Sequence, residues 1–379
     1  MKLFQCQNCG QTLHFENTRC EHCGLALGYL PHRETMTALQ PNAGGPDQQP
    51  QFWRALADGG KYRYCANAAY DVCNWLIPAA QTDTYCAACR HNRMIPDLSL
   101  AENLMRWRAM EVAKHRLFYT LFQLRLPLAT KAESPDGLAF EFLAAAPGAA
   151  PVMTGHAGGV ITINLAEADD SERERRRHEM REPYRTLLGH FRHEAGHYYW
   201  DRLVADSPDI EEFRRMFGDE RQDYAQALQN YYANGAPADW SEHFISPYAS
   251  AHPWEDFAET WAHYFHMIDT LETAHVVGLA VSPKLPQGPG AVFDFNPREA
   301  DMKQLVEAWL ALTYAVNSIN RSMGVQDLYP FVLGPFAVDK LTFVRDRIRH
   351  AGTERCAING GGHSRAHDQR GQIRCAVSL

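Results

Sequence analysis

The placement of cysteine is the feature that most restricts what this chain can fold into. Eight of its ten cysteines lie before residue 90, and four of these form two pairs with two-residue spacing, Cys6–Cys9 and Cys20–Cys23. This spacing lets a tight turn direct both sulfurs at one ion, so two pairs supply the four soft ligands of a tetrahedral zinc. We therefore predict a structural zinc ribbon over residues 1–30, with iron or a redox dithiol as the alternative.

A second group follows, formed by Cys65, Cys73, Cys86 and Cys89. Only Cys86 and Cys89 have the two-residue spacing, so buried, reduced cysteines remain the alternative to a metal site. We predict a second four-cysteine zinc module over residues 61–98. Because four cysteines leave no open coordination position, both predicted sites are structural rather than catalytic.

Charge and hydropathy exclude several functions. The net charge is −8 and the pI is about 6.1, so no positive field favours nucleic acid, and we do not expect nucleic acid as a partner. The N-terminus lacks the apolar core of a signal peptide, and no stretch of about 18 apolar residues predicts a membrane span. Clustered cysteines without a secretion signal favour metal ligation in a reducing, cytoplasmic setting.

The rest of the chain predicts an α+β protein whose larger part is mostly helical with a small β-sheet. Proline, glycine and glutamine predict a linker over residues 31–60, and the composition of residues 351–379 predicts a disordered tail. Between them, residues 99–350 form the predicted main domain. Its periodic segments indicate strands at 138–143 and 159–165, and helices at 100–126, 183–204, 208–217, 220–233, 254–275, 299–323 and 337–350.

One predicted helix carries the sequence His-Glu-Ala-Gly-His, from His193 to His197. Positions i and i+4 share a helix face, so both imidazoles can bind one zinc ion. Glu194 lies beside the first ligand and is the candidate general base, which takes a proton from a zinc-activated water and delivers it to the leaving amine. His190, one turn earlier, is predicted to lie at the surface or behind the metal ligands.

The predicted zinc site needs a third protein ligand, and the residue type of that ligand distinguishes the subclasses of zinc peptidases. Trp200 and Leu203 stand where a metzincin-like site would need Gly and His, so that subclass is excluded. On the helix at 254–275, Glu255 and Glu259 lie one turn apart, and acidic side chains on such an aromatic-rich helix need a positive partner. We assign Glu255 as the third zinc ligand and Glu259 as the carboxylate that orients a ligand imidazole. His263 is the next candidate if Glu255 does not bind.

With these residues, the sequence resembles the gluzincin clan, including the lethal-factor type of metallopeptidase. The resemblance rests on His-Glu-x-x-His followed by Tyr248, six residues, Glu255, three residues and Glu259. It implies a zincin-like fold for residues 99–350, with Glu255 as ligand and Glu259 behind it. It also implies that Tyr248 stabilises the tetrahedral intermediate, as a phenol can by donating a hydrogen bond to an oxyanion.

The chain is also similar over about residues 1–350 to a bacterial family of zinc-binding metallopeptidases with an N-terminal zinc ribbon. The segments that carry this similarity are Tyr62–Asn67, Cys73–Leu76, Cys86–Arg90, Ile95–Leu98 and Phe191–Trp200. It strengthens the assignment of Cys65 and Cys73 as zinc ligands. It says little about substrate.

Together these observations predict a zinc-dependent hydrolase that cleaves peptide bonds, with one catalytic and two structural zinc ions. Its expected partner is a peptide or protein substrate, and the zinc ribbons could recruit a further protein. Two alternatives stay open. One is a non-catalytic adaptor whose ribbons bind protein or nucleic acid and whose histidine site is structural. The other is a zinc hydrolase acting on non-peptide amides.

Overall fold

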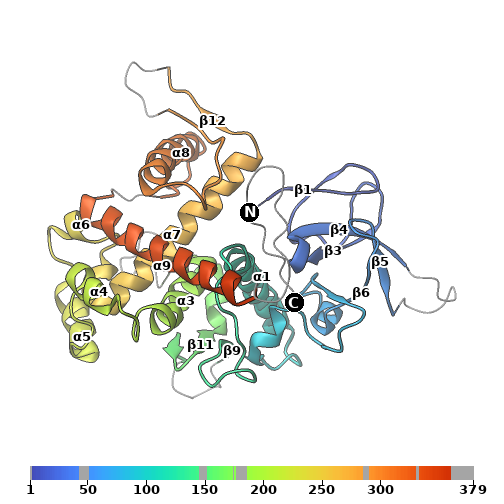
Figure 1. Ribbon diagram of the computed structural model, residues 1–379, viewed down its shortest axis with the longest axis horizontal. Helices are drawn as coiled ribbons and strands as arrows, with labels where there is room; N and C mark the ends of the chain where they lie inside the picture. Colours follow the sequence, from blue (N-terminus) through green and yellow to red (C-terminus); the bar gives the residue numbers. More distant parts are fainter. Residues whose placement is uncertain are drawn as a thin grey trace.

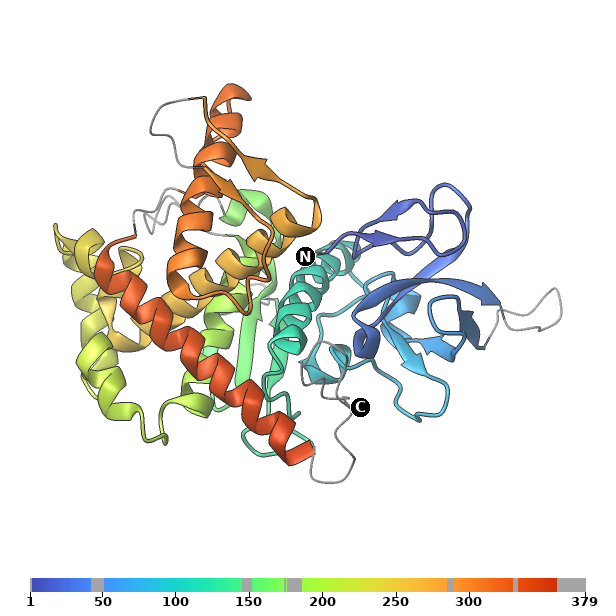
Figure 2. The ribbon, with the colours of Figure 1, turned by 45° about the horizontal axis from the view of Figure 1, so that its top comes forward.

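The computed structural model describes residues 2–41, 51–144, 152–173, 175, 186–284, 290–329 and 333–359, with side chains up to residue 353. Short strands form the N-terminal part and helices form most of the C-terminal part, with α1 (Ala101–Gln123) between the two (Figures 1 and 2). This mixture of helix and sheet agrees with the predicted α+β class. Within the described residues, no helix combines the length and hydropathy needed to cross a lipid bilayer.

The N-terminal part contains a two-stranded ribbon and a five-stranded sheet. The ribbon pairs β1 (Phe4–Gln5) with β2 (Thr12–Leu13). The sheet is antiparallel throughout and consists, in spatial order, of β3 (Ala26–Leu30), β4 (Thr35–Pro41), β5 (Trp53–Ala55), β6 (Lys61–Tyr64) and β7 (Leu76–Pro78).

The predicted linker over residues 31–60 is therefore wrong for much of its length. A 3-10 turn, η1 (Pro31–Arg33), leads directly into β4, and both β4 and β5 are inner strands of the sheet. Met36, Ala38 and Leu39 of β4 are fully buried, so this strand is held by packing on both of its faces. Residues 42–50 lie outside the described residues.

A four-stranded sheet lies beneath the helices, in the order β10 (Gly155–Ala157), β11 (Val160–Asn164), β9 (Ala139–Leu143) and β8 (Asn92–Met94). β11 and β8 both run parallel to β9, whereas β10 runs antiparallel to β11. The strands predicted at 138–143 and 159–165 are thereby confirmed. The 3-10 turn η3 (Cys89–His91) leads into β8, and η4 (Leu165–Ala168) follows β11, whereas η2 (Ala66–Tyr70) lies between β6 and β7 of the five-stranded sheet.

Five of the seven predicted helices are confirmed within a few residues, and a sixth, predicted at 337–350, is confirmed but longer. The start predicted at 183 for the seventh lies outside the described residues. α3 begins at Leu187, where Thr186 accepts a hydrogen bond from the Gly189 amide as the N-cap. α9 extends to residue 359, into the predicted tail, and the rest of that tail lies outside the described residues. The C-terminal elements are α3 (Leu187–Leu203), α4 (Ile210–Phe217), α5 (Tyr224–Asn234), α6 (Trp240–His243), η5 (Tyr248–Ala251), α7 (Pro253–Val276), β12 (Ala280–Val281), β13 (Ala291–Val292), α8 (Met302–Ser322) and α9 (Pro335–Asn359).

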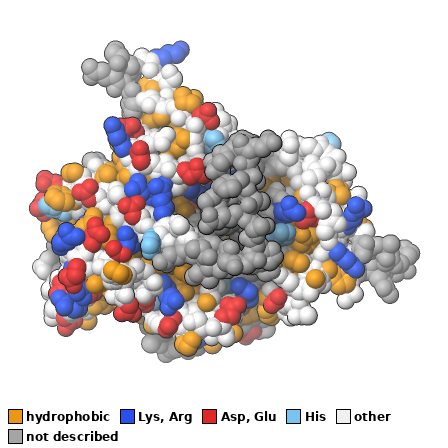
Figure 3. Space-filling model, in the orientation of Figure 1, with side chains coloured by type: hydrophobic (Ala, Val, Ile, Leu, Met, Phe, Trp, Pro, Cys, Tyr) orange, Lys and Arg blue, Asp and Glu red, His pale blue; other side chains and the backbone are white. Residues whose placement is uncertain are grey.

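α1 joins the two parts into one hydrophobic core. On one side, the ring of Phe15 packs edge-on against Tyr119 with centroids 5.5 Å apart. On the other side, the Tyr119 hydroxyl donates to Glu272 of α7 at 2.9 Å, and Thr120 donates to Asp269 at 2.6 Å. In the view of Figure 3, acidic and basic side chains alternate over the helical part, as expected from the small net charge.

Candidate metal centres

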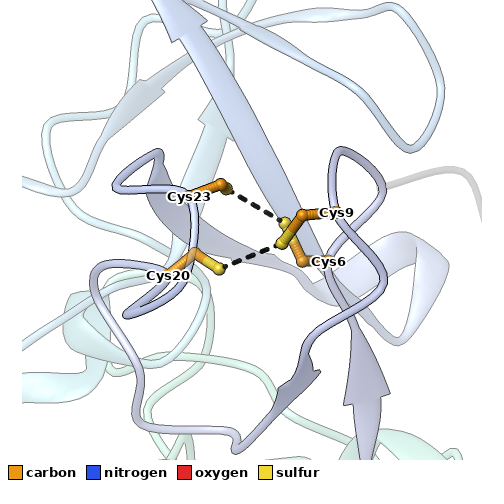
Figure 4. A group of neighbouring side chains, drawn as sticks. All are labelled: Cys6, Cys9, Cys20 and Cys23. Atoms are coloured by element: carbon orange, nitrogen blue, oxygen red, sulfur yellow. Dashed lines mark hydrogen bonds between the residues drawn. The ribbon is translucent and has the colours of Figure 1, made fainter.

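The first cysteine cluster is brought together by two tight turns (Figure 4). The Sγ atoms of Cys6 and Cys23 lie 3.7 Å apart, and those of Cys9 and Cys20 lie 3.6 Å apart. Four zinc–sulfur bonds of about 2.3 Å would separate the sulfurs by about 3.8 Å, so the spacing fits a tetrahedral ion. The glycine after each pair has a φ of +75° or +73°, which a residue with a Cβ rarely adopts.

The second cluster lies between the five-stranded sheet and α1. All four predicted cysteines, Cys65, Cys73, Cys86 and Cys89, are buried, and their sulfurs lie within 4.8 Å of one another. Cys73 and Cys86 are 3.7 Å apart, again close to the edge of a zinc–thiolate tetrahedron. In contrast, the first cluster is partly open to solvent at Cys9 and Cys23.

The third centre lies where α3 packs against α7. The two helices are held together by aromatic contacts such as the stacked rings of Tyr199 and Trp261, 4.9 Å apart and inclined by 16°. This packing turns His193 and His197 of α3 toward Glu255 of α7. The three residues form a group whose ligand atoms all lie within 4.8 Å of one another.

The distances within this group match a zinc site. His193 Nε2 lies 3.0 Å from Glu255 Oε2 and 3.1 Å from His197 Nε2, and His197 Nε2 lies 3.5 Å from Glu255 Oε1. Tetrahedral zinc with bonds of about 2.0–2.1 Å would separate such ligand atoms by about 3.3 Å. Glu255 Oε2 is buried and has no hydrogen-bond donor among the described residues. A buried carboxylate oxygen in this state needs a cation, so these residues fit the ion.

Glu259 fixes the orientation of the first imidazole. Its Oε1 accepts a hydrogen bond from His193 Nδ1 at 2.7 Å, and its Oε2 accepts one from Ser246 Oγ at 2.6 Å. With its proton on Nδ1, His193 presents the Nε2 lone pair to the metal position. Burial raises the pKa of Glu259, but the bonds from His193 and Ser246 outweigh burial and lower it to about 2. Ser246 was not anticipated from sequence.

Glu194 lies beside the group and is 4% exposed. Its Oε1 is 3.3 Å from His190 Nε2, and its Oε2 is buried without a hydrogen bond among the described residues. Burial raises the pKa of Glu194, but the bond to His190 and the nearby imidazoles hold it below its usual value. His190 Nδ1 in turn bonds Glu167, which accepts from Thr154 Oγ1 at 2.6 Å. His190 thus links the candidate base Glu194 to Glu167 of η4 and to Thr154, which precedes β10. Sequence spacing alone does not reveal these contacts.

Two tyrosines face the group from different elements. The ring of Tyr248, predicted as an oxyanion donor, lies 6.0 Å from the ring of His193. Tyr224 of α5 was not predicted, yet its hydroxyl donates to Glu255 Oε1 at 2.6 Å. His263, the next candidate if Glu255 does not bind, instead forms a hydrogen bond with the hydroxyl of Tyr329 and is not part of the metal-ligand group.

The group opens into a cavity of about 660 Å³, a size typical of ligand pockets. Its lining includes the metal-ligand group and Glu194. One wall comes from the segment Val152–His156, which includes the start of β10. The lining also includes four aromatic side chains, those of Tyr224, Tyr232, Tyr248 and Trp254.

Comparison with known proteins adds two family matches. Residues 103–347 match a family described as "putative zinc-binding metallo-peptidase", and residues 3–100 match a zinc-ribbon domain. Uncharacterised proteins of Mycobacterium bovis and of two Mycobacterium tuberculosis strains are each 42% identical over 352 residues, which cover 91% of this chain and 94% of each relative. No solved structure matches the chain.

Proposed function

Because this chain belongs to the zinc-binding metallo-peptidase family, we propose that it is a gluzincin-type peptidase that hydrolyses amide bonds. The catalytic zinc would be held by His193, His197 and Glu255. The observation that carries this proposal is the convergence of two imidazoles and one carboxylate from two helices, with nitrogen and oxygen atoms 3.0–3.5 Å apart, in the lining of one cavity. Two further zinc ions would be structural, one in each cysteine cluster, and the working compartment would be the cytoplasm, where thiols stay reduced.

Bound zinc would supply a Lewis acid that polarises the substrate carbonyl and acidifies a water molecule. The chain itself supplies the proton acceptor. Glu194 Oε2 has no competing hydrogen bond among the described residues, and the lowered pKa of Glu194 keeps it ionised at neutral pH. His190 holds the other oxygen, so the carboxylate stays directed at the cavity and can pass the proton to the leaving amine.

The two tyrosines would have separate tasks. Tyr224 donates a hydrogen bond to Glu255 Oε1, so Oε2 would be the oxygen available to the metal. Tyr248, beside His193, would donate its phenolic proton in a hydrogen bond to the oxyanion of the tetrahedral intermediate.

A peptide is favoured over a small amide by the strand on the cavity wall. Among the described residues, β10 is the edge of the four-stranded sheet, and its start lines the cavity. An exposed strand edge can pair with an extended peptide through main-chain hydrogen bonds. Glu194 Oε2, which is buried and has no hydrogen-bond partner within the part of the chain that the structure describes, also favours catalysis over the structural adaptor, since an adaptor has no use for such a group.

The decisive variant is Glu194→Gln, tested on the zinc-loaded full chain with an unstructured protein such as casein. We expect unchanged zinc content and loss of about 10²–10⁴-fold in hydrolysis, the usual contribution of a general base. Glu212→Gln, at a residue of α4 outside the cavity lining, is the matched control and should retain activity. Wild-type protein that carries its zinc yet cleaves no peptide library would favour the adaptor.

A further inference from the structure

The second cysteine cluster has five possible metal-ligand atoms, one more than a tetrahedral zinc ion binds. Besides its four sulfurs, His115 of α1 directs Nε2 at the cluster, 3.4 Å from Cys73 Sγ and 3.7 Å from Cys89 Sγ. A zinc ion bound to one imidazole and one thiolate would separate the two ligand atoms by about 3.6 Å. The imidazole is therefore at a ligand's distance from its neighbours.

The hydrogen bond at the other ring nitrogen sets the tautomer of His115. Nδ1 lies 2.6 Å from the backbone carbonyl oxygen of Glu111. A carbonyl oxygen can only accept, so Nδ1 must carry the proton. The neutral ring then has its lone pair on Nε2, facing the sulfurs, which is the form that binds zinc.

Cys89 differs from the other three cysteines in its surroundings. Cys65, Cys73 and Cys86 each accept a backbone N–H bond at 3.3–3.4 Å, as metal-bound thiolates commonly do. Among the described residues, no backbone N–H donates to Cys89 Sγ. That sulfur instead lies 3.7 Å from Glu111 Oε2, in the geometry of a thiol that donates a hydrogen bond to the carboxylate.

Burial also favours an imidazole ligand here. Zinc with four thiolates carries a net charge of −2, and every cysteine of this cluster is buried. Lys114 is fully buried beside the cluster, but its ammonium is 2.8 Å from Glu111, so the two charges offset each other. Exchanging one thiolate for a neutral imidazole halves the charge that must be desolvated.

We propose that His115 is a ligand of the second zinc, together with Cys65, Cys73 and Cys86, and that Cys89 is left as an uncoordinated thiol. The site is then of the three-cysteine, one-histidine type, and α1 itself holds one corner of it. This proposal is independent of whether the chain is a peptidase.

The test compares Cys89→Ser with His115→Ala in the full chain, by counting bound zinc and measuring its affinity in chelator competition. We expect Cys89→Ser to keep the wild-type zinc number and affinity. His115→Ala should lose one zinc, with a weakening beyond the about 10–100-fold that an outer partner's removal costs. Loss of zinc in Cys89→Ser, or its retention in His115→Ala, would each overturn the proposal.

Misfolding of His115→Ala is controlled by a third variant. His115→Cys combined with Cys89→Ser offers four thiolates at the proposed ligand positions, so it should recover the zinc that His115→Ala loses. Circular dichroism of all variants shows whether each chain is folded. A folded double variant that still lacks this zinc would contradict the assignment of position 115.

Discussion

Gly196 of α3 lies directly against Ala258 of α7. A Cβ built on Gly196 would come within 2.8 Å of the Ala258 Cα and 3.2 Å of its carbonyl oxygen. Real Cβ atoms do not approach backbone so closely, so only glycine permits this helix spacing. The contact lies between His193 and His197 on one helix and beside Glu255 and Glu259 on the other. The glycine within the His-Glu-x-x-His segment therefore sets the distance between the candidate metal ligands of the two helices.

Gly196→Ala should force α3 and α7 apart. We expect a loss of about 1–3 kcal/mol in the free energy of unfolding, as for other overpacked cores, and weaker zinc binding at the third centre. Urea unfolding and zinc counting measure the two effects. Gly189→Ala is the control on the same helix, because there the nearest atoms belong to the side chains of Thr186 and His266, at 3.0 and 3.5 Å, and not to the backbone of α7. Equal effects of the two substitutions would argue against the spacing role.

Tyr224→Phe removes the hydrogen bond to Glu255 without changing the shape of the cavity wall. We expect catalytic zinc to bind about 10–100-fold more weakly, the usual cost of losing a partner behind a metal ligand. Tyr232→Phe, on the same helix and the same wall, should bind zinc like wild type. Chelator competition measures the zinc affinity of both variants. An unchanged affinity for Tyr224→Phe would refute the role of Tyr224 in positioning Glu255.

His190→Ala should alter the pH dependence of hydrolysis rather than zinc content. The bond from His190 lowers the pKa of Glu194, so its loss raises that pKa. A base with a higher pKa becomes protonated at higher pH, so activity should be lost earlier on acidification. The acid limb of the kcat/KM profile is the measurement, with His243→Ala, at a half-exposed position of α6, as the control. An acid limb that stays in place would contradict the link.

Lys340→Met should destabilise the junction of α9 and α7. Lys340 Nζ lies 2.5 Å from Asp256 Oδ2, and both side chains are buried. Removing one partner of a buried pair costs about 3–5 kcal/mol, because the other charge is left without compensation. The double variant Lys340→Met with Asp256→Asn should recover most of the loss in urea unfolding. Arg321→Met, which breaks a solvent-exposed pair with Asp327, should change stability little.

The sequence could predict the members of the third centre because helical periodicity converts spacing into position. Residues 193 and 197 share a face, as do 255 and 259, and both pairs prove to lie together in the structure. Tyr224, His190 and Ser246 act through contacts between elements that are distant along the chain. No local spacing encodes such contacts, so these residues could not be assigned before the fold was known.

The linker prediction failed for a different physical reason. The proline- and glycine-rich stretch after residue 41 dominates the composition of residues 31–60, whereas the alternation that marks β4 extends over only a few residues. β4 is stabilised by pairing with β3 and β5 on either side and by burial of both of its faces. Such pairing is a tertiary property, since an isolated strand of this length is not stable in water.

The position of α1 has a consequence for the preparation of the helical part alone. Trp107, Phe118 and Tyr119 are at most 1% exposed, and Arg116 forms an ion pair with Glu16 at 2.7 Å. Cutting the chain before residue 99 would remove the N-terminal strands that cover this helix and would expose its hydrophobic side chains to water. A truncated fragment should therefore aggregate or bind other proteins through this exposed surface. The intact polypeptide is the better choice for purification.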